Sequence, residues 1–529
     1  MRRLLNLALA ALALAAWAAA AEEYDLEKVR ADDAQLIREW SQAGWDNSVY
    51  GKPLDIAGLL EKYSYLSDDP QLLAFIKKQR DQAPDLKEAR RLHYLYRDLA
   101  TTYESKRVAA VQDDLENRDA VDYIWVRGFD EPIPVRNFRV IMREADDEEP
   151  YMNLYYAIGN YAVLVRNPLR RERLHIHHAS TRAAGYESYA DFYYQMLGYE
   201  PGVPAAQARQ FRDETFPVFK ELVTARCRQL YGKDPADTPP WESKNIYWGK
   251  DFDPYFPKEK FLDFTYSFFS GLGMDVRKLP NVTVDDADRP AKEPRAACWP
   301  FDAPFDVRVN LKPVGGVDDY ETAFHEFGHA LYSSYMDPGL PYEFRMLGSN
   351  ELTETYATLF QDMFGDRAFL VEELAMPEEV ADDFLRFKLM TDMGAARGVA
   401  FDVIYDEALH SGELENPLAF YDAEVDKQRL FPKYPCNVEA AYLSVDEGFY
   451  ALYYMAAYYA AAQLRAKLRE DFGPRWYKDP AAGDTLKDLF RRGDSITVTE
   501  MLQQIGYPEG LDPAYLIVYY RARYDALKQ

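Results

Sequence analysis

His325-Glu326-Phe327-Gly328-His329 places two imidazoles four residues apart, with a carboxylate directly after the first. On a helix, residues i and i+4 project from one face, so a single Zn²⁺ could bind both rings. Glu326 would then lie within reach of a water on that metal. The pattern is typical of zinc hydrolases, in which the metal acidifies water and a neighbouring carboxylate takes its proton. The competing interpretation is an amphipathic helix with two incidental histidines.

The residues around this pentapeptide predict a helix. Asp318, Asp319 and Glu321 precede it and favour a helix N-terminus through the helix dipole. Pro338 and Gly339 mark its end. Apolar side chains accompany the histidines: Ala323, Phe324, Phe327, Ala330 and Leu331. We therefore expect the histidines on a helix of about five turns, not in a loop.

A catalytic zinc site needs a third protein ligand and an open position for water. The segment 348–360 predicts a second helix with Asn350 as its N-cap. Glu351 and Glu354 compete for the ligand role, and we favour Glu354 because apolar residues flank it deeper in the helix. Glu351 then interacts with the helix dipole from the first turn. Thr358 either hydrogen-bonds a ligand or packs as an ordinary core threonine.

The segment 448–459 is rich in tyrosine. Hydrolysis of an amide builds negative charge on the carbonyl oxygen, and a tyrosine hydroxyl can stabilise that charge beside a metal. Tyr450 and Tyr453 share a helical face and are our candidates for this role. The competing interpretation is an aromatic packing seam.

The run His175-Ile176-His177-His178 holds three of the seven histidines. A second metal site is one interpretation, but the neighbouring arginines oppose cation binding. We therefore expect a solvated helix face here. We expect the isolated His93 and His410 to be structural.

The N-terminus predicts a signal peptide over residues 1–21. Arg2 and Arg3 are followed by an apolar run over 4–17 and by small residues around 20–21 that suit cleavage. The alternative is a permanent N-terminal anchor. We expect a periplasmic or secreted protein with no membrane contact after cleavage.

Charge and cysteine content exclude several functions. Removing residues 1–21, which carry two arginines and no acidic residue, would change the net charge from −26 to −28. Such an acidic chain argues against nucleic-acid binding. Three cysteines and no C-x-x-C pair leave at least one thiol unpaired and give a cysteine–zinc site no support. The sequence contains no G-x-S-x-G elbow, Walker A loop or complete G-x-G-x-x-G fingerprint, so serine-hydrolase, P-loop and Rossmann interpretations are excluded.

Hydrophobic periodicity predicts a mainly α fold. The longest expected helices cover 27–45, 87–115, 172–197, 205–231 and 379–410. Two stretches look extended, 134–142 and 305–314. The second precedes the histidine helix and either offers its edge to an extended peptide or forms a small structural hairpin.

Glu321-Thr322-Ala323-Phe324-His325-Glu326-Phe327-Gly328-His329-Ala330-Leu331 resembles the zinc helix of the thimet oligopeptidase and neurolysin family, and the segment 184–191 is also similar to that family. The resemblance implies His325, His329 and Glu354 as ligands of one Zn²⁺, Glu326 as general base, and Glu321 as support behind the ligands. It implies a large helical metallopeptidase of two lobes that enclose a deep channel for short peptides. We expect an N-terminal helical region over 22–150 and the catalytic region over 151–529.

The tyrosine segment departs from this family. Ser444 stands where the family has a histidine, and Ala456 where it has a tyrosine. In another register, Tyr450 and Tyr453 are similar to the tyrosine pair of angiotensin-converting enzyme, in which the first holds a substrate's C-terminal carboxylate and the second supports the oxyanion. The sequence therefore leaves three functions open: oligopeptidase, dipeptidyl carboxypeptidase, and catalytically idle peptide-binding protein.

Overall fold

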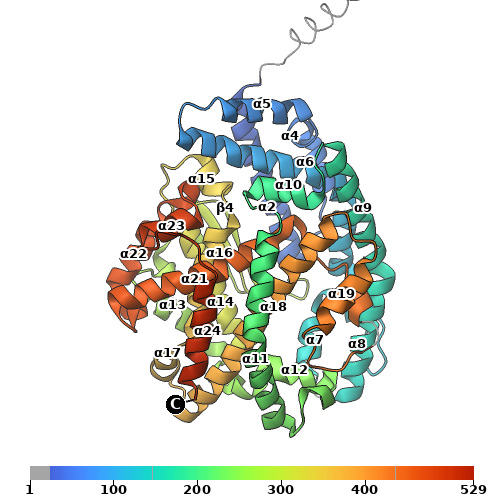
Figure 1. Cartoon of the computed structure of the whole chain (residues 1–529), viewed down its shortest axis with the longest axis vertical. Helices are drawn as coiled ribbons and strands as arrows, with labels where there is room; N and C mark the ends of the chain where they lie inside the picture. Colours follow the sequence, from blue (N-terminus) through green and yellow to red (C-terminus); the bar gives the residue numbers. More distant parts are fainter. Residues whose placement is uncertain (1–23, 146, 435–436, 529) are drawn as a thin grey trace, which may run out of the picture.

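The computed structural model describes residues 24–145, 147–434 and 437–528, and the fold is mainly helical (Figure 1). The predicted signal peptide lies outside the described residues. No helix in the described part of the chain combines the length and apolar character needed to cross a bilayer.

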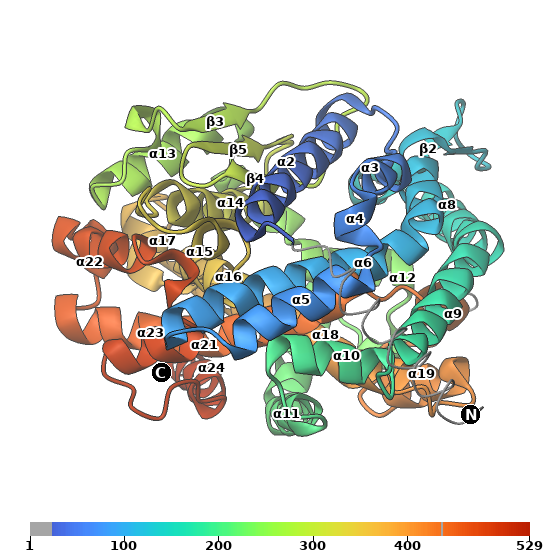
Figure 2. The same cartoon turned by 90° about the horizontal axis from the view of Figure 1, so that it is seen from above.

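The first helices cover one end of the molecule (Figures 1 and 2). They are α2 (Leu26–Tyr50), α3 (Ile56–Lys62), α4 (Ser64–Ser67), α5 (Pro70–Asp81) and α6 (Leu86–Val121). Aspartates start four of them: the side chains of Asp25, Asp55, Asp69 and Asp85 accept backbone N–H groups of α2, α3, α5 and α6. The predicted helices at 27–45 and 87–115 are therefore confirmed.

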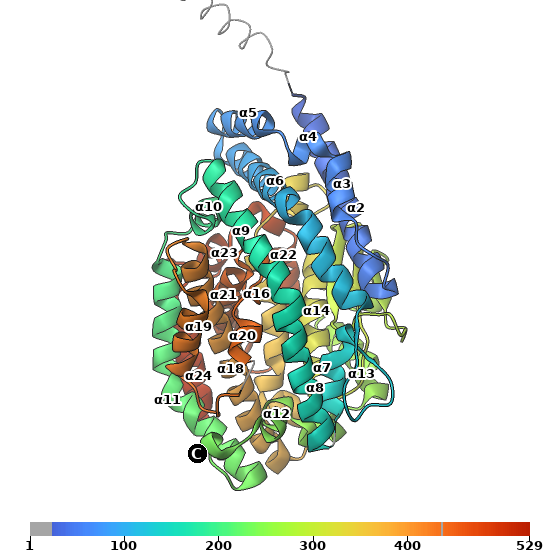
Figure 3. The same cartoon turned by 90° about the vertical axis from the view of Figure 1, so that its right-hand side faces the viewer.

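More helices follow along the chain, and α9 lies side by side with α6 (Figure 3). It contains α7 (Phe138–Glu144), α8 (Glu148–Tyr161), α9 (Asn167–Ala183), α10 (Tyr189–Leu197), α11 (Val203–Tyr231), α12 (Pro240–Trp248) and α13 (Phe261–Gly271). The single helix expected over 172–197 is two helices. Gly185 has a φ of 96°, and Ser188 caps α10 through the N–H of Asp191.

The extended segment expected at 134–142 is wrong. Only Ile133–Pro134 forms a strand (β2), paired with β1 (Tyr123–Ile124), and α7 follows. Phe138, Ile141 and Met142 have helical spacing and pack in a small apolar cluster of their own with residues of α8.

Three strands form a sheet beside the histidine helix: β3 (Val282–Asp285), β4 (Ala297–Asp302) and β5 (Asp306–Asn310), in the order β3-β5-β4. β5 confirms the strand predicted within 305–314. It is parallel to β3 and antiparallel to β4, so both of its edges are paired and it cannot receive a peptide strand. β4 lies at an edge of the sheet, with α2 packed against it (Figure 2).

The remaining helices include the histidine helix, α14. They are α14 (Val317–Ser334), α15 (Tyr342–Met346), α16 (Asn350–Gln361), α17 (Arg367–Glu372), α18 (Glu378–His410), α19 (Pro417–Asp426), α20 (Asn437–Ala441), α21 (Tyr450–Phe472), α22 (Pro480–Phe490), α23 (Val498–Gln504) and α24 (Ala514–Ala526). α14 packs on α16, α16 on α21, and α11 on α18. One main apolar core takes residues from α2 through α24, so it includes both the predicted N-terminal region and the predicted catalytic region.

Candidate metal centre

The pentapeptide lies within α14, an 18-residue helix that matches the five turns predicted from the sequence. The carboxylate of Asp319 accepts the N–H groups of Val314 at 2.6 Å and Gly315 at 2.5 Å, which ties the preceding loop to the first turn. The N-cap of α16 is Ser349, not Asn350 as expected, because the Ser349 hydroxyl accepts the N–H of Glu351.

Gly328 sets the distance between the two helices. A Cβ atom at this position would lie 2.6 Å from Cα of Ala357 and 3.0 Å from the carbonyl oxygen of Tyr356, closer than side chains tolerate. Only glycine therefore allows α14 and α16 to pack this tightly. The glycine inside the pentapeptide thus brings the histidines of α14 close to the acidic residues of α16.

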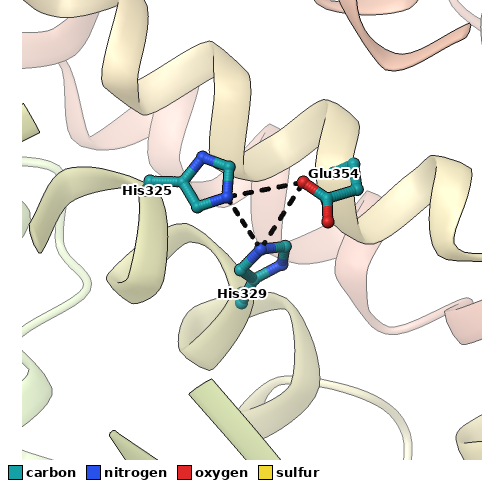
Figure 4. Close-up of side chains that lie close together, drawn as sticks. All are labelled: His325, His329 and Glu354. Atoms are coloured by element: carbon teal, nitrogen blue, oxygen red, sulfur yellow. Dashed lines mark hydrogen bonds and ion pairs between the residues drawn. The ribbon is translucent and has the colours of Figure 1, made fainter. Parts of the chain in front are cut away.

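Figure 4 shows the result: His325, His329 and Glu354 point at one another. The Nε2 atoms of the two histidines are 3.1 Å apart, and Oε2 of Glu354 lies 3.4 Å from Nε2 of His325 and 3.7 Å from Nε2 of His329. Zinc–ligand bonds of about 2.0–2.1 Å in a tetrahedron place neighbouring ligand atoms about 3.3–3.4 Å apart. The three atoms therefore have the separations that one small divalent cation requires.

The chemistry of the three atoms fits a cation as well. Oε2 of Glu354 is buried and has no hydrogen-bond partner among the described residues, although Glu354 is only 2% exposed. Nδ1 of His325 lies 3.0 Å from Oε1 of Gln361, which can only accept, so Nδ1 donates and Nε2 is the ring nitrogen that faces the triad. A buried carboxylate oxygen and two imidazole nitrogens that converge on one point suit a metal ion.

The environment keeps Glu354 ionised. Burial alone would raise its pKa, but the imidazoles of His329 and His325 and the hydroxyl of Tyr450 hold the pKa below its ordinary value. Glu354 is therefore a carboxylate at neutral pH, which is the form that binds metals. The side chains of His325 and His329 are 16% and 15% exposed, so the triad is not sealed from solvent.

Two residues of α16 orient the imidazoles, and neither was expected from the sequence. Gln361 holds Nδ1 of His325, and Oγ1 of Thr353 lies 2.7 Å from Nδ1 of His329. Metal-binding histidines need such a partner for their second ring nitrogen. This requirement could have identified Gln361 and Thr353 from the sequence, because both residues lie on the predicted helix that carries Glu354.

The residues expected behind the ligands have other contacts. The Thr358 hydroxyl makes no hydrogen bond to a described residue, in keeping with the packing interpretation. Glu321 accepts a hydrogen bond from Lys388 of α18 at 2.9 Å. Glu321 therefore anchors α14 to α18, one turn before His325.

Glu326 lies beside the triad. It is 8% exposed and makes no hydrogen bond or ion pair with another described residue. Its charge reaches Cys298 of β4: burial raises the pKa of that thiol, and the Glu326 carboxylate raises it further. Glu326 therefore lies on the side of α14 that faces β4.

Glu351 lies apart from the triad. It accepts a hydrogen bond from the Tyr199 hydroxyl, and burial raises its pKa. Of the two glutamates considered as the third ligand, Glu354 is the one that the fold places with the histidines.

The two candidate tyrosines have different positions. The Tyr450 hydroxyl donates to Oε1 of Glu354 at 2.8 Å, so this side chain touches the triad directly. The Tyr453 ring packs edge-on against Tyr450 with centroids 5.4 Å apart. Burial raises the pKa of Tyr453. The charge of Arg97 lowers this pKa and the charge of Glu351 raises it, so the Tyr453 hydroxyl lies within electrostatic range of both residues.

The histidine run at 175–178 is not wholly a solvated face. His175 is exposed, but His177 is buried between Glu104 and Glu447, with 3.4 Å to each. Nε2 of His178 lies 3.4 Å from Nδ1 of His410. Distant helices supply these partners, so a pattern confined to 170–178 could not reveal them.

Within the described ranges, His325, His329 and Glu354 form the one group of three such side chains arranged to hold a metal ion. Cys227 and Cys298 are free thiols, and Cys436 lies outside the described residues. A scan of the chain against protein-family models gives no match, and a search of curated proteins gives none either.

Proposed function

We propose that this protein is a zinc-dependent peptidase that hydrolyses peptide bonds in short peptides, with one Zn²⁺ per chain. The observation that carries the proposal is the meeting of three ligand atoms from α14 and α16, one of them a buried carboxylate oxygen without a partner, directly beside the unpaired Glu326. The resemblance of residues 321–331 to the thimet oligopeptidase and neurolysin family points to the same activity.

His325, His329 and Glu354 would hold the ion, with Gln361 and Thr353 fixing the two imidazoles. Zinc, when bound, lowers the pKa of a coordinated water to about 7. Glu326 would take a proton from the attacking water and deliver it to the nitrogen of the leaving amine. Tyr453, with Tyr450, would donate to the carbonyl oxygen as it becomes negative. Tyr450 would first have to exchange its bond to Glu354 for one to the substrate.

The restriction to short peptides, the two lobes and the enclosed channel come from the family resemblance and belong to this proposal. So does export to the periplasm or the exterior, which depends on removal of residues 1–21. We propose short peptides as the partners of the exported chain, and neither nucleic acid nor membranes.

A second candidate is release of C-terminal dipeptides, which requires a cation for the substrate's terminal carboxylate. Arg295, just before β4, is exposed and makes no ion pair with a described residue. Arg295 also lies within electrostatic range of Tyr454, because its charge opposes the rise in the Tyr454 pKa that burial causes. The Tyr454 ring packs against Tyr450. Amidation of the substrate C-terminus separates the candidates, because only dipeptide release should lose most of its rate.

The deciding experiment combines activity with metal content. Glu326→Gln should retain stoichiometric zinc and lose at least about 1,000-fold in kcat on an internally quenched peptide, since the proton acceptor is gone. Glu259→Gln, an exposed glutamate, is the matched control and should behave as wild type. Near-wild-type turnover by Glu326→Gln would contradict the mechanism, and tight peptide binding without cleavage by the zinc-loaded wild type would favour the idle peptide-binding protein.

A further inference from the structure

A pocket of about 970 Å³ opens between α17, α18, α21 and α24, at the end of the molecule where the C-terminus lies (Figure 1). No residue of the metal centre lines it. Small-molecule sites in proteins occupy about 300–1,000 Å³, so this pocket is large enough for a ligand of its own.

Arginines dominate its polar lining, although acidic residues outnumber basic ones by 88 to 62 in the whole chain. The five are Arg367, Arg386, Arg465, Arg469 and Arg523, and only two lining residues are acidic, Asp366 and Asp382. We refer to this site as the arginine pocket. Guanidinium groups gathered around one space are suited to bind carboxylates.

Arg523 has a donor that the described protein does not use. Its Nη2 atom is buried and has no hydrogen-bond partner among the described residues. A Cβ at position 365 would lie 2.7 Å from this atom, so Gly365 leaves the room that the guanidinium occupies in the pocket wall. A buried unused donor is costly unless a ligand or water accepts from it.

Nearby carboxylates orient the arginines without using all their donors. Asp392 accepts from Nη1 of Arg523 at 2.6 Å, and Asp366 accepts from Nη1 of Arg469 at 2.9 Å. Arg465, only 4% exposed, donates from Nη1 to the carbonyl oxygen of Asp362 at 3.1 Å. Each guanidinium has five N–H groups, so these bonds fix its plane and leave donors for a further acceptor.

The rest of the lining is apolar. Leu385, Ala462 and Ala522 contribute aliphatic surface, and Tyr515 and Val518 of α24 line it although they are 37% and 60% exposed. An inorganic anion would leave this surface in water. A ligand with a carboxylate and an apolar body would use both parts of the lining.

We propose that the arginine pocket binds a small carboxylate that carries an aromatic or alkyl body, with its acidic group on the arginines and its body against α21 and α24. The site is independent of the metal centre and of the peptidase activity proposed above.

Isothermal titration of the whole protein with 4-phenylbutyrate tests the proposal. Binding should saturate. 4-Phenylbutanol, which lacks the charge, and acetate, which lacks the body, should each bind at least about ten-fold more weakly, because a charge-assisted hydrogen bond or the apolar contact is lost. Equal binding of the alcohol, or no saturation with the acid, would overturn it.

Substitutions locate the ligand. Ala466→Trp and Ala522→Trp fill the pocket from two exposed positions and should abolish binding, whereas Ala206→Trp, at an exposed position of α11, should not. Arg469→Gln should weaken binding about ten-fold or more, against no change for Arg277→Gln on the surface. Thermal melts identify any variant that does not fold. If one tryptophan variant fails to fold, the other still tests the pocket. Unchanged binding to a folded tryptophan variant would overturn the assignment. The same result is expected if phenylbutyrate binds the zinc and not the arginine pocket.

Discussion

The metal centre and the Lys388 cluster (Glu321, Lys388, Asp392 and Arg523) both bury two carboxylates, but they differ in the source of positive charge. In the Lys388 cluster, Nζ of Lys388 contacts both carboxylates, and Nη1 of Arg523 lies 2.6 Å from Asp392. Two cations of the chain therefore lie against two carboxylates. At the metal centre, Glu326 and Glu354 form no ion pair with a lysine or arginine of the described chain.

This difference fits a structural role for the Lys388 cluster and supports the metal site proposed above. The cost of burying a carboxylate is offset when the chain supplies the cation, and the result is a fixed link, here between α14, α18 and α24. At the candidate metal centre only two imidazoles lie beside the two carboxylates, so no permanently charged side chain of the described residues balances them. A divalent cation has the required charge as well as the required geometry.

Removing the internal cation should give the largest loss of stability. Lys388→Met leaves Glu321 and Asp392 buried with less compensation, and we expect a loss of about 3–5 kcal/mol in the free energy of unfolding. Denaturant unfolding followed by circular dichroism measures it, with the exposed Lys220→Met as control. A loss below about 1 kcal/mol would mean that Lys388 does not hold this cluster together.

Removing the partners of the imidazoles should weaken zinc without unfolding the protein. Thr353→Val and Gln361→Leu each delete a hydrogen bond to Nδ1 of a ligand, and we expect each to lower zinc affinity about 10–100-fold. Competition with a chromophoric chelator measures the affinity. Thr358→Val lies on the same helix and should have little effect, so an equal loss there would point to general damage to α16.

Widening the contact between α14 and α16 should impair the metal centre from a distance. Gly328→Ala forces its methyl group into Ala357, with an expected cost of about 1–3 kcal/mol and weaker zinc binding. Gly398→Ala on α18 meets open space, and a glycine-to-alanine change within a helix should stabilise by roughly 0.5–1 kcal/mol. Opposite signs for these two variants are expected; a neutral Gly328→Ala would show that the close approach is not needed.

A third charged cluster, Asp285 with Arg289 and Lys292, also contains its own cations. Its contribution to stability should therefore decrease at low pH. Burial raises the pKa of Asp285, but Arg289 and Lys292 outweigh burial and lower it to about 2. Because the folded pKa lies below the unfolded value, the pair stabilises the fold above about pH 4, and this contribution is lost as the pH falls toward 2. We expect a difference of about 1 kcal/mol between wild type and Asp285→Asn at pH 5 that shrinks by pH 2.5 in thermal melts. A constant difference would contradict the ion-pair account.

The sequence predicted what depends on neighbours along the chain. The spacing of His325 and His329, the five turns of α14 and the apolar flanks of Glu354 are local properties, and the structure places these three residues together. Gln361 and Thr353 were missed because their contacts depend on the register between two helices. That register is set by one close approach at Gly328, which residue spacing does not report.

The errors have the same origin. The helix at Phe138–Glu144 looked extended because its apolar partners come from α8, and His177 looked exposed because Glu104 and Glu447 lie far along the sequence. Similarly, β5 looked like an available edge because the pairing of β3 and β4 on either side of it is a long-range feature.

The most direct test of whether a divalent cation binds at the triad is a zinc titration of metal-free wild-type protein and of Glu354→Ala. Elemental analysis and the rise in melting temperature measure the uptake. Wild type should take up one equivalent and gain about 4 kcal/mol at a free zinc concentration 1,000 times its dissociation constant. Glu354→Ala should lose stoichiometric uptake. Wild type without stoichiometric zinc, or unchanged uptake by Glu354→Ala, would contradict the account.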